Sequence, residues 1–145
     1  MTNESPAPID LTVFAEGIEA AFGDGTPTIW ATASKAGVPD IAPKGSTMVF
    51  DKDHLAFWER AHGTTLENLK ESPHAAMFYR NRERGVGARR FFGTVELFPS
   101  GEIREQVRAR TVQAELDRDP DNKGVAVVIC IDRVVEGGRE LQRRS

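Results

Sequence analysis

Between residues 28 and 58 the sequence alternates between short β-forming segments and turn residues, and this pattern constrains the fold most. β-branched and aromatic residues are concentrated in the segments, while Gly, Pro, Asp and Lys separate them. The connections are too short for a crossover, so neighbouring strands must run antiparallel. The sequence predicts strands at 28–34, 38–43, 46–50 and 54–58.

The rest of the chain predicts helices and further strands around this β region. Apolar residues at helical spacing follow Asp10, a good N-cap, and predict a helix of about three turns that Gly23 ends. Gly93 is predicted to be a β-bulge or a point of close approach. The other predicted elements are a helix at 64–71, strands at 74–80 and 89–98, a helix capped by Ser100 that carries Ile103, Val107 and Leu116, and a strand at 124–135. About six or seven strands and three helices predict a small antiparallel barrel of α+β character.

The length of 145 residues predicts one domain with a single core, because it is too short for a cofactor domain plus a separate substrate domain. Residues 1–8 are expected to be flexible, and the tail 137–145 is expected to be frayed or docked on a partner subunit. Additional binding surface would then come from a second copy of the chain.

Charge and composition exclude several classes of function. A formal net charge of −3 argues against a nucleic-acid or anionic-membrane binder that depends on bulk electrostatics. No apolar run approaches the roughly 18 residues needed to span a bilayer, and the N-terminus has no export signal. The single cysteine, Cys130, lies in an apolar strand and is expected to be a buried, inert thiol. These features are typical of a cytoplasmic protein.

Residues for conventional catalysis are missing from the sequence. His54, His62 and His74 lie on separate predicted elements without the spacing of metal ligands, so no metal site is expected. No Ser-His-Asp order, no phosphate-binding glycine loop and no paired carboxylates stand out. If the protein is an enzyme, a cofactor must supply the chemistry.

Lys44 and the start of the predicted helix at 64–71 are typical of an anion site. Free backbone amides and the helix dipole both favour negative charge there. Thr64 and Glu67 have the spacing of a capping box, in which Thr64 accepts from the Glu67 amide. Thr65 then keeps a free hydroxyl, and Asn68 lies on about the same helix face. An ordinary solvated helix start and an exposed strand lysine are the structural alternatives.

Five arginines around residues 80–90 form a second candidate site, because like charges at this density repel unless anions are nearby. Arg89 and Arg90 are suited to bidentate phosphate recognition. The loop 83–87 between them is either a mobile lid or a plain hairpin connection.

The order of several motifs resembles the pyridoxamine 5′-phosphate oxidase-related family of FMN-binding split barrels. The resemblance covers about residues 28 to 98, and the order and spacing of the motifs carry it rather than any single one. The motifs are Trp30-Ala-Thr-Ala-Ser-Lys-Ala-Gly37, Pro39, Ala42-Pro-Lys-Gly-Ser46, Leu55-Ala-Phe-Trp58, Thr64-Thr-Leu-Glu-Asn-Leu69, Pro73 and Ala75-Ala-Met-Phe78. The resemblance implies a six-stranded antiparallel split β-barrel with the three helices at its flanks, a homodimer, and FMN at the subunit interface.

By this resemblance, the strand around Lys44 and the predicted helix at 64–71 contact the flavin. Pro43 and Gly45 allow a flat ring to approach the backbone, and Lys44 meets either the phosphate or the N1–O2 edge of the ring. The predicted cofactor-binding residues are Pro43, Lys44, Gly45, Ser46, Thr47, Phe57, Trp58, Thr64, Thr65, Asn68, Arg89 and Arg90. Trp58 is alternatively an aromatic residue of the core or of an interface.

The chain departs from true pyridoxamine phosphate oxidases, because it ends without the C-terminal substrate elements associated with them. The resemblance therefore implies an FMN-dependent oxidoreductase of unknown small substrate, with NAD(P)H as a possible electron donor. The alternatives are a flavin-binding or redox-sensing module with little turnover, and a relative that takes a deazaflavin or haem. A small structural barrel whose arginine loop binds an acidic partner is the non-flavin alternative.

Overall fold

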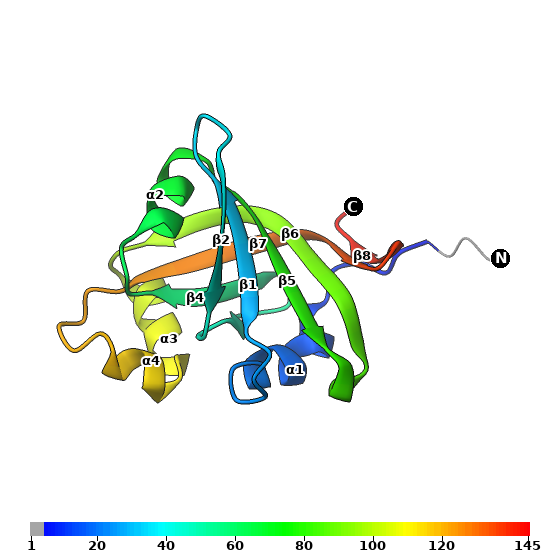
Figure 1. Ribbon diagram of the computed structural model, residues 1–145, viewed down its shortest axis with the longest axis horizontal. Helices are drawn as coiled ribbons and strands as arrows, with labels where there is room; N and C mark the ends of the chain where they lie inside the picture. The colour runs from blue at the N-terminus through cyan, green and yellow to red at the C-terminus, as the bar shows by residue number, and fades with distance from the viewer. Residues whose placement is uncertain (1–4) are drawn as a thin grey trace.

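The computed structural model describes residues 5–145, in which one curled antiparallel sheet of eight strands forms most of the fold (Figure 1). Two short 3-10 helices and four α-helices complete the described part of the chain. In chain order the elements are η1 (Leu11–Phe14), α1 (Ala15–Ala20), β1 (Thr28–Ala33), β2 (Pro39–Lys44), β3 (Met48–Val49), β4 (His54–Glu59), α2 (Thr64–Glu71), β5 (His74–Asn81), η2 (Arg82–Arg84), β6 (Val86–Phe98), α3 (Glu102–Arg110), α4 (Gln113–Asp117), β7 (Val125–Glu136) and β8 (Arg139–Arg143).

The sheet has the strand order β2-β1-β5-β6-β7-β4-β3, and β8 pairs with β7 beside this path. All pairings between these strands are antiparallel, which confirms the predicted mostly-β architecture of the split-barrel type. The structure has eight strands, against six in the split barrel that the resemblance implies. Seven of them form in the predicted strand segments, although the 46–50 segment gives only the short β3, and the C-terminal tail adds β8. β2 and β3 are the two edges of the sheet, and residues 45–47 connect them.

The first half of β7 is buried on both faces, and its sequence explains why. Residues 125–129 are all apolar and all buried, without the polar alternation of a strand that has one face in water. One face of β7 lines the barrel interior, while Ala126 and Val128 on the other face belong to a cluster with Val107 of α3. Both faces of this part of the strand are therefore covered.

Gly93 forms the bulge that the sequence predicts. The register between β6 and β7 shifts between Phe92 and Gly93. A Cβ atom at Gly93 would lie 2.2 Å from the carbonyl oxygen of Cys130, a distance that no side chain tolerates. Glycine is required at this position because the neighbouring backbone passes so close.

The first helix is shorter and less regular than predicted. Asp10 caps it, since its side chain accepts from the Thr12 amide, but the 3-10 turn η1 precedes α1 and the α-helix ends at Ala20. The left-handed residue after the helix is Gly25, with φ of 75°, and not Gly23. The helix predicted from Ser100 is also divided: Gly101 is the N-cap of α3, and Thr111 and Val112 in extended conformation separate α3 from α4.

The C-terminal tail is a strand of the sheet, which differs from the expected frayed or partner-docked segment. β8 pairs with β7, and Ala7 makes backbone hydrogen bonds to Leu141 and Arg143 on its other side. The buried Gln142 side chain accepts from the Asp10 amide and donates to the Asp10 carbonyl. The expected flexible segment 1–8 is thus held at Ala7, and its residues 1–4 lie outside the described part of the chain.

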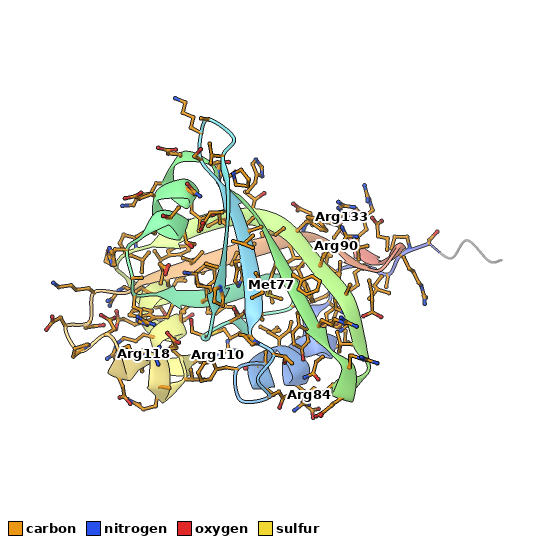
Figure 2. The ribbon with its side chains drawn as sticks, in the orientation of Figure 1. Met77, Arg84, Arg90, Arg110, Arg118 and Arg133 are labelled. Carbon is orange, nitrogen blue, oxygen red and sulfur yellow. The ribbon has the colours of Figure 1, made fainter. Side chains whose placement is uncertain are left out.

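The barrel interior is an apolar core closed by polar contacts between the two sheet edges. Trp30, Phe57, Met77, Tyr79 and Phe91 are among its fully buried side chains, and Figure 2 labels Met77 within it. Polar side chains join β1 and β2 to β4 and to the 45–47 connection, and we call this junction the seam. Its main contacts are the Lys44–Glu59 ion pair, the hydrogen bond from the Trp30 indole to Thr47, and a hydrogen bond between the hydroxyls of Thr28 and Thr47.

The outer surface of β2, β1, β5 and β6 carries apolar side chains that the described chain leaves uncovered. Ile41 is 72% exposed and Phe78 is 39% exposed. Strand pairing places them on neighbouring rows, because Ile41 is opposite Ala31 and Phe78 is opposite Ile29. We call Ile29, Ile41, Ala76, Phe78 and Phe92 the outer sheet face. Arg90 and Arg133, which lie close together in Figure 2, stack on Phe92 with guanidinium-to-centroid distances of 5.7 and 4.2 Å.

Candidate functional site

A small pocket at the seam contains several of the predicted site residues. Its volume is about 70 Å³, which is room for roughly two water molecules. We call it the seam pocket. It is lined by Pro43, Lys44, Gly45, Ser46, Trp58, Glu59, Arg60, Ala61 and Glu115. The structure therefore brings five of the twelve predicted residues together in a space that one flavin ring would exceed.

Lys44 is bound to a carboxylate of the same chain. Its ammonium nitrogen lies 3.0 Å from both carboxylate oxygens of Glu59 and 5.8 Å from the centre of the Phe57 ring. The Glu59 side chain is only 2% exposed and that of Lys44 is 14% exposed. A carboxylate buried this deeply requires its cation, so Lys44 balances Glu59 before any ligand arrives.

Ser46 and Trp58 hold the backbone of the seam together. The Ser46 hydroxyl accepts from the Trp58 amide at 2.9 Å and donates to the Trp58 carbonyl at 3.3 Å, which replaces a backbone pair that β3 is too short to make. The Trp58 indole donates to Asp119 at 3.0 Å, and the Arg104 guanidinium stacks on its ring at 4.7 Å. Both predicted residues are buried and fully engaged inside the chain.

Asp119 remains charged although it is buried. Burial alone would raise the pKa of its carboxyl, but the amides of Lys123 and Gly124 and the Trp58 indole donate to it and hold the pKa below its ordinary value. This carboxylate fixes the loop before β7 against the outer side of Trp58.

Gly45 contacts side chains of the same protein on the side where its Cβ would be. A Cβ atom there would lie 2.6 Å from a carboxylate oxygen of Glu115 and 3.0 Å from the Phe22 ring. Glu115 in turn accepts from Arg60 at 2.9 Å. Within one chain, Glu115 and Phe22 therefore occupy the space next to Gly45, and the approach of a flat ring to this backbone stays a prediction.

The start of α2 is uncapped, in contrast to the predicted capping box. Gly63 is the N-cap and Thr64 is the first helical residue, so the Glu67 amide donates to the Gly63 carbonyl instead of the Thr64 hydroxyl. The amides of Thr64, Thr65 and Leu66 consequently have no partner within the helix and no side-chain cap. The Thr65 side chain is 4% exposed, and its hydroxyl has no hydrogen bond among residues 5–145.

Three further predicted residues, Thr47, Phe57 and Asn68, make contacts inside the chain that hold the barrel together. Thr47 accepts from the Trp30 indole and lies 2.7 Å from the Thr28 hydroxyl. Phe57 packs against Trp30 with ring centres 5.1 Å apart. Asn68 donates to the Thr32 hydroxyl at 3.1 Å, which ties α2 to β1.

Arg89 and Arg90 lie away from the seam pocket within one chain. Strand pairing links Pro43 to Ile29, Phe78 and Arg90 in one row, so three strand spacings, about 14 Å, separate Pro43 from Arg90. Arg89 binds Glu136 at 2.8–2.9 Å and stacks on Phe14, while Arg90 donates to the Gly137 carbonyl. The 83–87 loop is a hairpin connection with a 3-10 turn, fixed to α1 and the loop after it because Arg84 binds Asp24 and Glu16.

Glu59 and Glu115 are site residues that sequence reasoning missed. Alternation along β4 places Glu59 on the same face as Leu55 and Phe57, so a carboxylate in the interior was visible in the pattern. Glu115 lies on α4, which sequence periodicity merged with α3, and no local signal places it at Gly45. Neither a metal-binding cluster nor a helix long and apolar enough to cross a membrane is found among residues 5–145.

Comparison with known proteins identifies the fold. Residues 16–134 match the family model described as pyridoxamine 5′-phosphate oxidase. No curated protein matches the sequence. Among solved structures, a proposed pyridoxamine 5′-phosphate oxidase from Lactobacillus delbrueckii is 25% identical with a TM-score of 0.63, over 81% of this chain and 89% of its own.

Two other solved structures share the fold at lower identity. An FMN-binding protein from Syntrophomonas wolfei is 15% identical with a TM-score of 0.67, over 86% of each chain. A haem-binding protein from Mycobacterium smegmatis is 18% identical with a TM-score of 0.60, over 86% of this chain and 55% of its own.

Proposed function

The chain belongs to the pyridoxamine 5′-phosphate oxidase family, and from this premise we propose that it binds FMN between two copies and acts as an oxidoreductase on a small substrate. The observation that carries the proposal is the uncapped start of α2. Three free amides at a helix N-terminus, next to the unpaired hydroxyl of Thr65, which solvent still reaches although the residue is largely buried, suit a phosphate group.

The residues around the seam pocket differ in how well they would contact FMN. Pro43 and Ser46 border the seam pocket, and because that pocket is too small for a flavin, the ring would lie at its mouth and not inside it. Lys44 fits poorly as a phosphate ligand, because Glu59 neutralises it. We therefore assign the phosphate to the start of α2. Lys44 would lie beside the flavin ring and would balance the charge of Glu59 there.

A second copy of the chain would complete the cleft. The seam pocket is too small for the cofactor, and the outer sheet face leaves Ile41 and Phe78 uncovered. Burying this apolar surface against its symmetry mate would stabilise a dimer. Arg90 borders the same face and could then serve the partner's site, whereas Arg89 would have to leave Glu136.

FMN, when bound, would accept or donate a hydride at its N5 atom. The residues of this chain would hold the phosphate at α2, orient the ring along 43–46 and keep charge balanced through the Lys44–Glu59 pair. NAD(P)H is the electron donor to test first, since the described chain contains no redox group of its own apart from Cys130.

The test is a titration of the purified protein with FMN and with riboflavin, followed by absorption. Wild type is expected to bind FMN more tightly, because riboflavin lacks the phosphate. Thr65→Val keeps the shape and removes the hydroxyl, so it should weaken FMN by about 1 kcal/mol and leave riboflavin unchanged. Equal losses for both ligands would remove Thr65 from the phosphate site.

Two outcomes of the same experiment separate the alternatives. A protein that binds FMN but is not bleached by NAD(P)H or turned over with any donor is a flavin-binding module. A protein that is purified without colour, does not bind added FMN and does bind added deazaflavin or haem contradicts the FMN assignment.

A further inference from the structure

A second pocket lies on the outside of the barrel, between α3 and the turn that joins β3 to β4. Its volume is about 320 Å³, at the lower end of the range for small-molecule sites. We call it the α3 pocket. It is lined by Phe50, Asp51, His54, Thr94, Val95, Glu96, Phe98, Ile103, Val128 and Cys130. None of these residues lines the seam pocket.

Strand register explains why these residues meet. Cys130 is opposite His54 on β4 and opposite Thr94 on β6, and Val128 is opposite Glu96 in the next outward-facing row. α3 covers only one part of this surface, where Val107 packs against Val128 and Trp58. The uncovered part has an apolar floor of Phe98, Ile103 and Val128.

The charges around this apolar floor are negative. Glu96 is exposed and has no ion-pair partner among residues 5–145. Burial would raise the pKa of Asp51, but hydrogen bonds from His54, at 2.7 Å, and from the Asp53 amide hold it below its ordinary value. Asp51 is therefore charged at neutral pH with His54 as its partner, and neither lysine nor arginine lines the pocket.

Nearby cations are occupied elsewhere. Arg110 donates to the carbonyls of Val49 and Phe50, and Arg144 binds Asp53 and the Ile131 carbonyl. The Cys130 thiol adds no compensating charge, because burial raises its pKa and keeps it protonated. The pocket thus combines an apolar floor with two carboxylates that have no arginine or lysine of the chain bound to them.

We propose that the α3 pocket binds a small organic amine, with its aromatic or branched body on Phe98, Ile103 and Val128 and its ammonium group between Asp51 and Glu96. An ammonium group is preferred over a carboxylate because the pocket is lined by two carboxylic side chains and by no lysine or arginine. The volume limits the ligand to about one aromatic ring with a short side chain.

Cys130, the single cysteine of the chain, reports on occupancy. The rate of its alkylation by iodoacetamide is measured with phenethylamine, 2-phenylethanol and 3-phenylpropionate, which share a ring and differ in charge. Phenethylamine is expected to protect the thiol, with half-protection at about 1 mM, and the other two to protect at least about fivefold less. Equal protection by all three, or none by phenethylamine, overturns the proposal.

Matched variants locate the charge effect. Glu96→Gln should weaken protection by phenethylamine about threefold, as expected for a partly exposed ion pair, while Glu83→Gln on the distant 82–84 turn should leave it unchanged. The same loss in both variants would mean that only net charge matters, which overturns the proposal.

A second measurement does not depend on the reactivity of the thiol. Saturation-transfer NMR of phenethylamine is expected to show binding to wild type and to lose the signal in Thr94→Trp, whose indole fills the pocket from an exposed strand position. An undiminished signal in Thr94→Trp places the amine elsewhere and overturns the proposal.

Discussion

Close backbone contacts decide what single positions tolerate, and Gly93 is the clearest case. A Cβ atom there would meet the Cys130 carbonyl, which belongs to a central strand and cannot move aside. Gly93→Ala is expected to lower the free energy of unfolding by about 3 kcal/mol, measured by urea denaturation. Gly138→Ala is the control, because nothing lies within 4 Å of its Cβ position. Equal unfolding midpoints would contradict the close contact.

Asp119 predicts a pH dependence at the residue scale. Its pKa in the folded protein lies below the ordinary value of 3.8, so its contribution to stability is complete above that pH and is lost as the pH falls through the lower folded value. Asp119→Asn should lose about 1–3 kcal/mol at pH 7 and should lack this part of the acid-induced loss.

The measurement is the free energy of unfolding between neutral pH and acid pH for wild type and variant. Asp117→Asn is the control, because that exposed carboxylate accepts a hydrogen bond only from the nearby Gln113. Parallel pH curves for wild type and Asp119→Asn would show that the buried carboxylate has no such role.

At the scale of elements, β8 fixes the N-terminal segment through one buried side chain. Gln142 accepts from the Asp10 amide and donates to the Asp10 carbonyl. Gln142→Ala leaves both groups unpaired at a half-buried position and is expected to cost about 1–2 kcal/mol. Faster amide hydrogen exchange at residues 10–12 should accompany the loss. The neighbouring exposed Arg143→Ala is the control, and equal exchange in both variants would contradict the link.

Much of the element order could be predicted from the sequence, because local patterns encode it. Alternating side chains and turn residues predicted the positions of β1, β2, β4, β5 and β6. Gly93 predicted the bulge in β6. β8 was missed because Arg139–Arg143 has four polar residues and little alternation, and its strand forms only by pairing with β7. The break between α3 and α4 was missed because Leu116 continues the apolar spacing across it.

The candidate site was harder to predict than the fold, because its contacts join distant segments. Sequence reasoning placed Lys44, Ser46 and Trp58 in one region, and the structure brings them to one pocket. The Lys44–Glu59 pair depends on how the two sheet edges meet, which no local pattern specifies. The Thr64 cap failed because Gly63 took the N-cap position one residue earlier.

At the scale of the whole molecule, the outer sheet face predicts self-association. Ile41→Asp puts a charge on the apolar face, at its most exposed side chain on the edge strand β2, and this charge would have to be desolvated in a dimer. The variant is expected to be monomeric by light scattering and to bind FMN at least about tenfold more weakly if the second copy completes the site. Val13→Asp is the control, because Val13 is 67% exposed but lies outside this face.

Two results would contradict this prediction. If wild type is a monomer at the concentrations at which it binds FMN, the second copy is not required. If Ile41→Asp remains a dimer, another surface makes the contact.

The position of β7 in both the sheet and the chain has a consequence for biosynthesis. β2, β1, β5 and β6 form one set of paired strands and β3 with β4 forms another, and β7 is the strand that joins them. Because β7 follows all of these in the chain, both incomplete halves emerge from the ribosome before the strand that joins them. Apolar faces on both halves remain open during that interval, so we expect nascent chains halted before Val125 to be held by chaperones and degraded.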